Sequence, residues 1–272
     1  MSGDRPTPGA NRLILCRRYA EIHSVCLLWA AMDVMWAAAG AVMGLPMGTA
    51  LRGPVFRLSV PSGVPDRTAC TACAAPVSRW PAMRCGQCGG SLGPPVALEL
   101  ATAAVLALLF GRFGGQPDMV AFGFLGVLGV GLAAIDIAVQ RLPDRLTLPA
   151  LPVLMILLAG AAVLGHDGAA LVRALLGGLV LAASYLLLAL LRPGQLGGGD
   201  IKLAALAGLT LGWLGWGPLL TGACLGFLLS AVVSVALLTT RRITLHSVIC
   251  FGPFLLGGTL LAILASGGGP GA

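Results

Sequence analysis

The stretch Met119–Val139, MVAFGFLGVLGVGLAAIDIAV, decides the fold class of this chain. It is an almost unbroken apolar run whose only charged side chain, Asp136, comes near its end. An α-helix needs about 20 apolar residues to cross the hydrocarbon core of a bilayer. A spanning segment must also satisfy its backbone polar groups internally, and the chain shows no alternating pattern of lipid-facing strands. The stretch therefore predicts a transmembrane helix.

The composition of the whole chain agrees with this stretch. Hydrophobic residues make up 57% of the 272 residues, charged residues make up 10%, and the mean hydropathy is +0.94. Soluble domains carry roughly 25% charged residues, so a soluble protein of this composition could not cover its surface. The composition excludes a soluble enzyme, a disordered tail and a nucleic-acid-binding module. The 40 glycines favour closely packed helices in a lipid bilayer.

Further apolar runs recur on both sides of 119–139, and the second and sixth of them are short. The predicted fold is an all-α, polytopic membrane helix bundle of about eight transmembrane helices. The predicted organisation is a basic N-terminal tail (1–24), a first transmembrane helix (25–51), a loop (52–95), a transmembrane domain (96–265) and a Gly-rich tail (266–272). The apolar runs are 25–51, 96–110, 119–139, 146–164, 169–191, 201–214, 216–238 and 248–265.

Basic side chains predict the orientation of these helices. The net charge is +7, and basic residues gather in alternate loops, where they mark the cytoplasmic side. The opposite loops hold only Arg112 and Arg173. The loop 52–95 is therefore predicted to be cytoplasmic. The basic residues on its side are Arg52, Arg57, Arg67, Arg79, Arg84, Arg141, Arg145, Arg192, Lys202, Arg241 and Arg242.

The tail 1–24 disagrees with this orientation because it places four arginines on the other side. A signal peptide would explain them, but the apolar run that follows has full span length and no clear cleavage site of small residues. We favour a second explanation, in which translation begins at Met32 or Met35. The four arginines are Arg5, Arg12, Arg17 and Arg18.

Two C-x-x-C pairs lie in the predicted cytoplasmic loop, and they consist of Cys70, Cys73, Cys85 and Cys88. Pairs at this spacing can place four thiolates tetrahedrally around one Zn²⁺. A pair of disulfides is the weaker alternative, because the cytoplasm is reducing. Four thiolates leave no open coordination position, so we expect the zinc to be structural.

Two carboxylates, Asp136 and Asp200, are predicted to lie at the same depth near the cytoplasmic interface. The span 119–139 runs inwards and ends near Asp136, whereas the span 201–214 runs outwards and begins next to Asp200. If the helices pack together, the pair would share a proton and could activate water for attack on a peptide carbonyl. The glycines at 197–199 would let a substrate backbone approach closely.

Three other interpretations of these carboxylates remain open. They could be separate interfacial aspartates that cap helices, with Asp200 as an N-cap. They could be proton relays of a transporter, although the spans 216–238 and 248–265 offer few polar side chains for a pathway. The chain could also be a zinc-stabilised assembly factor without catalysis.

Five motifs in one order resemble the type IV prepilin peptidase family, the bacterial leader peptidase/N-methyltransferases. The aspartates recur in I-D…L-P-D-x-L-T-L-P and G-x-G-D-x-K-L elements, a combination that is much more specific than either element alone. The motifs are GTALRGPVFRL (48–58), the paired C-x-x-C loop, IDIAVQRLPDRLTLP (135–149), GGGDIKL (197–203) and FGPF (251–254).

The resemblance implies that Asp136 and Asp200 are the catalytic dyad of an aspartic membrane protease and that 96–265 is its peptidase domain. It also implies a multi-pass protein of the bacterial cytoplasmic membrane, which cleaves short basic leaders from type IV prepilin or type II secretion pseudopilin precursors. Asp144 matches a further motif acid, which we interpret as the cap of the next helix. We expect no nucleic-acid partner.

The candidate substrate-binding residues are Gly197, Gly198, Gly199 and Lys202. For Lys202 there are two interpretations, a counter-charge near the dyad or an interfacial anchor, and we favour the anchor.

Many members of the family also methylate the new N-terminus with S-adenosylmethionine. In this chain Arg52 stands where the family usually has Asn, and Ser59 replaces a Pro, while Glu99 matches a motif acid. These departures leave cleavage supported and leave N-methylation open beside cleavage alone.

Overall fold

The computed structural model describes residues 31–61, 63–77, 84–90, 92, 96–165, 167–191, 197–241 and 250–266, and the backbone alone of 8–30. Within these residues the protein is all-helical, which confirms the predicted fold class. Its helices are α1 (Pro8–Leu58), α2 (Ala97–Phe113), α3 (Met119–Val139), α4 (Asp144–Gly165), α5 (Gly168–Leu191), α6 (Gly198–Leu214), α7 (Trp216–Thr239) and α8 (Gly252–Ala265).

Several of the described helices are long and apolar enough to cross a membrane by length and composition. Five meet both criteria: the Ala31–Leu58 part of α1, and α3, α4, α5 and α7. The helices α2 and α6 have 17 residues each, in agreement with the two short spans predicted, and α8 is a shorter apolar helix. The protein is therefore a multi-pass membrane protein.

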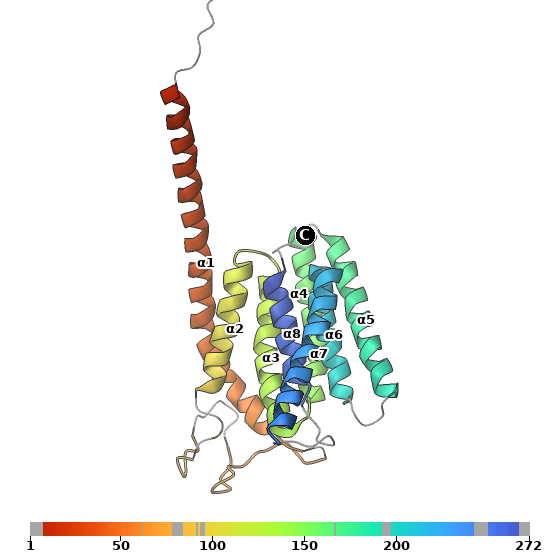
Figure 1. Ribbon diagram of the computed structural model, residues 1–272. Coiled ribbons are helices and arrows are strands. Elements are labelled where there is room, and N and C mark those ends of the chain that lie inside the picture. The colour runs from red at the N-terminus through yellow and green to blue at the C-terminus, as the bar shows by residue number, and fades with distance from the viewer. Residues whose placement is uncertain are drawn as a thin grey trace, which may run out of the picture.

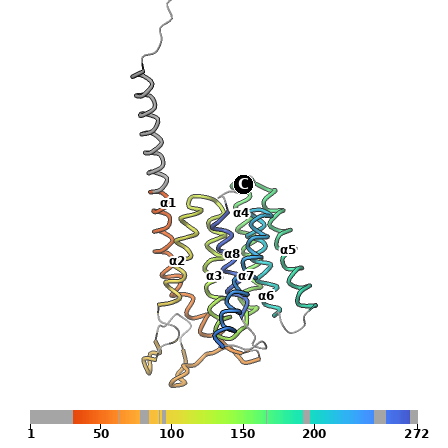
Figure 2. The backbone as a smooth tube through the Cα atoms, in the orientation of Figure 1, coloured from red at the N-terminus to blue at the C-terminus, as the bar shows by residue number. Residues whose placement is uncertain are grey.

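Successive helices run in alternating directions (Figure 1). The helices α1, α3, α5 and α7 finish at one end of the bundle, where α2, α4, α6 and α8 begin, and the cysteine loop lies at the same end. We call this the motif end. Figure 2 traces the same path, with α1 at one edge of the bundle and α5 at the other. The most extensive helix pairs are α1 with α2, α5 with α6, and α7 with α8.

Glycines set the close approach of α5 and α6. A Cβ atom on Gly177 would lie 2.7 Å from the carbonyl oxygen of Gly208, and one on Gly208 would lie 2.5 Å from the carbonyl oxygen of Gly177. No side chain fits at either position. Small residues let membrane helices approach until their backbones touch, so these two glycines fix the depth at which α5 and α6 pair.

The first helix extends beyond its predicted end. The sequence placed the end of the first span at Leu51, whereas α1 continues to Leu58. The charge of Arg52 does not end the helix, because its guanidinium is buried in an ion pair with Glu99 of α2. Val55, one turn later, packs against Leu98 and Ile135. The predicted tail 1–24, and the predicted tail 266–272 apart from Ser266, lie outside the residues described with side chains.

Replacing Gly208 by leucine should force α5 and α6 apart. Overpacking of a tight interface costs about 1–3 kcal/mol, so we expect Gly208→Leu to lower the thermal unfolding temperature in detergent. Gly160→Leu is the matched control, because a Cβ atom at Gly160 of α4 meets nothing within 4 Å. Equal unfolding temperatures of the two variants would contradict this account of the α5–α6 contact.

Candidate active site

Asp136 lies in the last turn of α3, where the apolar run ends, and only 4% of the residue is exposed. Its Oδ2 accepts a hydrogen bond of 3.0 Å from the backbone N–H of Gly252, the first residue of α8. A Cβ atom at position 252 would lie 2.7 Å from that oxygen, so a larger residue there would displace the carboxylate. The N-terminus of a helix favours a negative charge. The start of α8 therefore both positions and stabilises this carboxylate.

Asp200 lies in the first turn of α6 and reaches back to the start of its own helix. Its Oδ2 accepts a hydrogen bond of 3.1 Å from the backbone N–H of Gly197, as the third residue of a capping box does. The residue at the N-cap is Gly197, so the alternative that Asp200 is itself the N-cap is wrong.

The three glycines before Asp200 have different surroundings. A Cβ atom on Gly199 would lie 2.6 Å from the Cβ of Leu142, in the connection between α3 and α4, so Gly199 lets α6 pack against that connection. A Cβ atom on Gly198 would meet nothing within 4 Å. Close packing at Gly199 brings the start of α6 towards the end of α3. Open space remains beside Gly198.

Asp136 and Asp200 both lie at the motif end, one in the last turn of α3 and the other in the first turn of α6. The negative charge of Asp200 acts on the carboxyl group of Asp136, and both charges act on the thiol of Cys250, just before α8. Three helices thus converge on the pair, since α3 and α6 carry the carboxylates and α8 holds one of them. Such a pair can share a proton, which is the arrangement that activates water in aspartic proteases.

Lys202 contacts a different carboxylate. Its Nζ lies 2.6 Å from Oδ1 of Asp144, the residue that opens α4. Both side chains are partly exposed, so the pair adds little to stability. Among the described residues Lys202 is thus paired with Asp144 and not with the dyad, which does not favour the counter-charge interpretation, and its role as an interfacial anchor stays a prediction. The ion pair links the first turn of α4 to the first turn of α6, which also carries Asp200.

Tyr185 of α5 is a residue at this site that sequence reasoning missed. It is 1% exposed, its hydroxyl has no hydrogen-bond partner among the described residues, and the charge of Asp200 acts on it. Its ring lies 5.8 Å from the ring of Phe251, which directly precedes Gly252. A signal was available, because the chain has only two tyrosines and this one interrupts a leucine-rich span.

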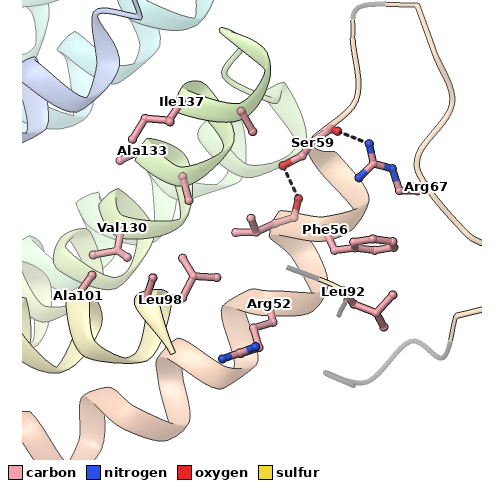
Figure 3. Close-up of a pocket in the computed structure, with 14 residues that line it drawn as sticks. Arg52, Phe56, Ser59, Arg67, Leu92, Leu98, Ala101, Val130, Ala133 and Ile137 are labelled. Carbon is pink, nitrogen blue, oxygen red and sulfur yellow. Dashed lines mark hydrogen bonds between the residues drawn. The ribbon is translucent and has the colours of Figure 1, made fainter. Parts of the chain in front are cut away.

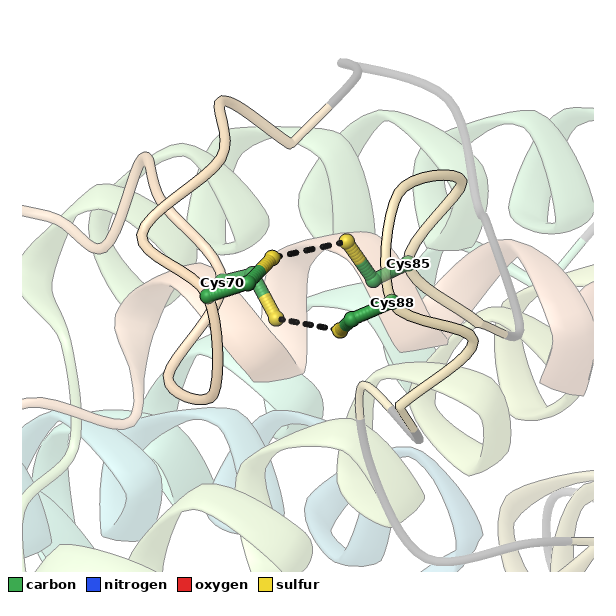
Figure 4. A group of neighbouring side chains, drawn as sticks. Cys70, Cys85 and Cys88 are labelled. Atoms are coloured by element: carbon green, nitrogen blue, oxygen red, sulfur yellow. Dashed lines mark hydrogen bonds between the residues drawn. The ribbon is translucent and has the colours of Figure 1, made fainter.

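The four cysteines of the loop after α1 form one cluster at the motif end (Figure 4). Their sulfur atoms all lie within 4.8 Å of one another. The Cys70–Cys88 sulfur distance is 3.7 Å and the Cys73–Cys85 distance is 3.6 Å. Four sulfurs placed tetrahedrally at about 2.3 Å from Zn²⁺ lie about 3.8 Å apart. The described cluster therefore fits a zinc ion.

The protonation of these thiols also suits a metal. The backbone N–H groups of Cys88 and Gln87 lower the pKa of Cys85 to about 6, and those of Ala72 and Cys73 lower the pKa of Cys70. For Cys73, the N–H of Ala75 favours the thiolate, but the sulfurs of Cys88 and Cys85 raise its pKa to about 12. The cluster thus holds protons that a divalent cation would displace on binding.

A cavity lies beside Arg52, between α1, α2 and α3, with a volume of about 560 Å³ (Figure 3). Its walls are mostly apolar and include Leu98 and Ile137. The guanidinium of Arg52 forms two hydrogen bonds with the carboxylate of Glu99, one of 2.8 Å from Nη2 to Oε2, and Arg52 is 5% exposed. The motif acid Glu99 therefore has a partner that the sequence reasoning did not assign to it.

Comparison with known proteins supports the motif order. A model of the type IV leader peptidase family matches residues 119–240, which contain both Asp136 and Asp200. The chain is 33% identical over 227 residues to a prepilin leader peptidase/N-methyltransferase of Aeromonas hydrophila, which covers 78% of this chain and 74% of the relative.

Two further relatives of the same name show a similar likeness. The chain is 33% identical over 221 residues to the protein of Burkholderia pseudomallei (strain K96243), covering 75% of this chain and 67% of the relative. It is 29% identical over 236 residues to the protein of Pseudomonas putida, and this match covers 82% of this chain and 77% of the relative. No solved structure matches the chain. The paired aspartates at the ends of α3 and α6, the family match around them and these relatives together show that the chain belongs to the type IV leader peptidase family.

Proposed function

We propose that this protein is an aspartic endopeptidase that removes the short basic leader from type IV prepilin or pseudopilin precursors. The convergence of Asp136 and Asp200 at one end of the bundle, inside the region that the family model matches, carries this proposal. The names of the relatives support the substrate class. They do not favour the transporter alternative or an assembly factor without catalysis.

In the proposed mechanism the two carboxyl groups share one proton. The ionised member takes a proton from water, whose oxygen attacks the carbonyl carbon of the scissile peptide, and the protonated member then protonates the departing amine. The backbone N–H groups of Gly252 and Gly197 bind Oδ2 of Asp136 and of Asp200, respectively. We propose that the Oδ1 atoms face each other and the water.

The position of the dyad suits a substrate that is partly in the membrane. We propose that the motif end faces the cytoplasm at the bacterial cytoplasmic membrane, because the basic side chains gather in the loops at that end. A precursor could then keep its basic leader at the interface and its apolar helix in the bilayer. We propose that the substrate backbone passes Gly198, where the structure leaves open space, and that Lys202 acts through Asp144 by holding the first turn of α6.

We propose that zinc, held by Cys70, Cys73, Cys85 and Cys88, ties together the two halves of the loop between α1 and α2. The donor set and the sulfur distances support this proposal. Four thiolates supply a closed, structural site and no open position for chemistry. Zinc would therefore fix the shape of the loop beside the active site.

The cavity beside Arg52 does not fit S-adenosylmethionine as it is folded. The ligand needs polar partners for its carboxylate, amine and adenine, but the described polar groups of this cavity bind one another. Arg52 is paired with Glu99, the hydroxyl of Ser59 donates to the carbonyl of Val55, and Arg67 donates to the carbonyl of Ser59. The cavity therefore supports no methylation step, and cleavage alone is the proposed activity.

The dyad can be tested with two conservative variants. Asp136→Asn and Asp200→Asn should each lower the cleavage rate of a purified prepilin by at least about 10³-fold, because an amide cannot take a proton from water. Mass analysis of the N-terminus of the product measures cleavage and detects any added methyl group. Asp167→Asn is the matched control, since Asp167 caps the start of α5 at the opposite end. Cleavage at the wild-type rate by both dyad variants would refute the proposal.

The zinc site predicts a metal content. The purified protein should contain about one zinc ion per chain, and Cys85→Ser should lose it and unfold at a lower temperature. Cys224→Ser, on an exposed position of α7, should keep the metal. Elemental analysis and titration of free thiols measure both outcomes. A metal-free wild-type protein whose four loop thiols all titrate would rule the site out.

A further inference from the structure

The hydroxyl of Tyr185 is a buried polar group that the mechanism above leaves unused. Its residue is 1% exposed, and the oxygen has no hydrogen-bond partner among the described residues. A buried hydroxyl without a partner destabilises the folded protein, and native proteins rarely keep one without a function. A phenylalanine would fill the same space without this cost. The hydroxyl is therefore free to form a hydrogen bond with a group that the described residues do not supply.

Aromatic packing fixes the position of this tyrosine. Its ring lies 5.6 Å from the ring of Phe227 on α7 and 5.8 Å from that of Phe251, and the two phenylalanine rings are 5.2 Å apart. Phe251 directly precedes Gly252, whose N–H binds Asp136. The turn that positions one catalytic carboxylate thus also positions the tyrosine.

The pairing of α5 with α6 places Tyr185 and Asp200 at the same depth along the bundle. The two helices touch at Gly177 and Gly208. Tyr185 comes eight residues after Gly177 and Asp200 eight residues before Gly208, which is about 12 Å along each antiparallel helix. The charge of Asp200 acts on Tyr185, so the two side chains are also neighbours across the bundle.

We propose that the hydroxyl of Tyr185 donates a hydrogen bond to the carbonyl oxygen of the scissile peptide. This inference rests on the proposed dyad function. As the oxygen of water bonds to the carbonyl carbon, the π electrons of the carbonyl move to its oxygen, and water gives its proton to the ionised aspartate. A phenol remains protonated at neutral pH and is a strong donor, so it stabilises this oxyanion. Tyr185 transfers no proton, and the C–N bond breaks with protonation of the amine by the dyad.

Tyr185→Phe separates this function from packing, because it removes the oxygen and keeps the ring. We expect kcat for prepilin cleavage to fall by about 10²-fold or more, as on loss of an oxyanion donor, while KM stays unchanged. The unfolding temperature should stay the same or rise, since the variant removes a buried polar group without a partner. Both are measured on the purified full chain in detergent.

Two further variants complete the test. Tyr185→Leu removes the ring as well and should lower both kcat and the unfolding temperature. Thr210→Val is the matched control, because it removes another fully buried hydroxyl, on α6, that bonds only within its own helix. We expect its kcat to equal that of the wild type.

The outcomes distinguish this inference from the function on which it rests. A wild-type kcat in Tyr185→Phe would overturn the role of the hydroxyl while leaving the dyad intact. A fall of the unfolding temperature together with the fall of kcat in Tyr185→Phe would also overturn it, because it would indicate that the hydroxyl acts through packing alone. Failure of the wild-type protein to cleave any prepilin, or full cleavage by the Asn variants of the dyad, would instead refute the proposed function.

Discussion

A carboxylate inside an apolar helix bundle is costly unless a donor meets it, and this requirement shapes the described bundle. Asp136 is met by the start of α8, and Asp200 by the start of its own helix. Glu99 is met by Arg52, and Asp118, at the opposite end, by the indole N–H of Trp213 at 3.0 Å. Each of these contacts joins two helices or fixes a helix end. The few acids of the chain therefore position the helices as well as serving the proposed chemistry.

The motif end combines close backbone contacts with partly exposed side chains. Gly252 and Gly199 let backbone approach Asp136 and Leu142 more closely than any side chain would permit. The glycine contact between α5 and α6 sets the depth of Asp200 and of Tyr185. In contrast, Lys202 and Asp144 remain partly exposed. The buried Asp136 and the partly exposed ion pair of Lys202 with Asp144 therefore lie at the same end of the bundle.

The sequence could predict the helices because each of them is a local apolar run, and the boundaries of α3, α5 and α7 follow those runs closely. It could also predict the four-cysteine cluster from the motif spacing, and the helix directions predict that Asp136 and Asp200 lie at the same end of the bundle. It could not predict the pairing of Arg52 with Glu99, which joins residues from different helices, nor the extension of α1 that this pairing permits. The surroundings of Tyr185 could not be predicted either, because they depend on how three helices pack together.

The buried pair of Arg52 and Glu99 restricts how this protein can change over generations. Loss of one partner would strand the other charge in an apolar site, at a cost of about 3–5 kcal/mol. That penalty is a large fraction of the stability of a typical domain. A single substitution at either position is therefore destabilising, and a change that keeps the stability replaces both residues together.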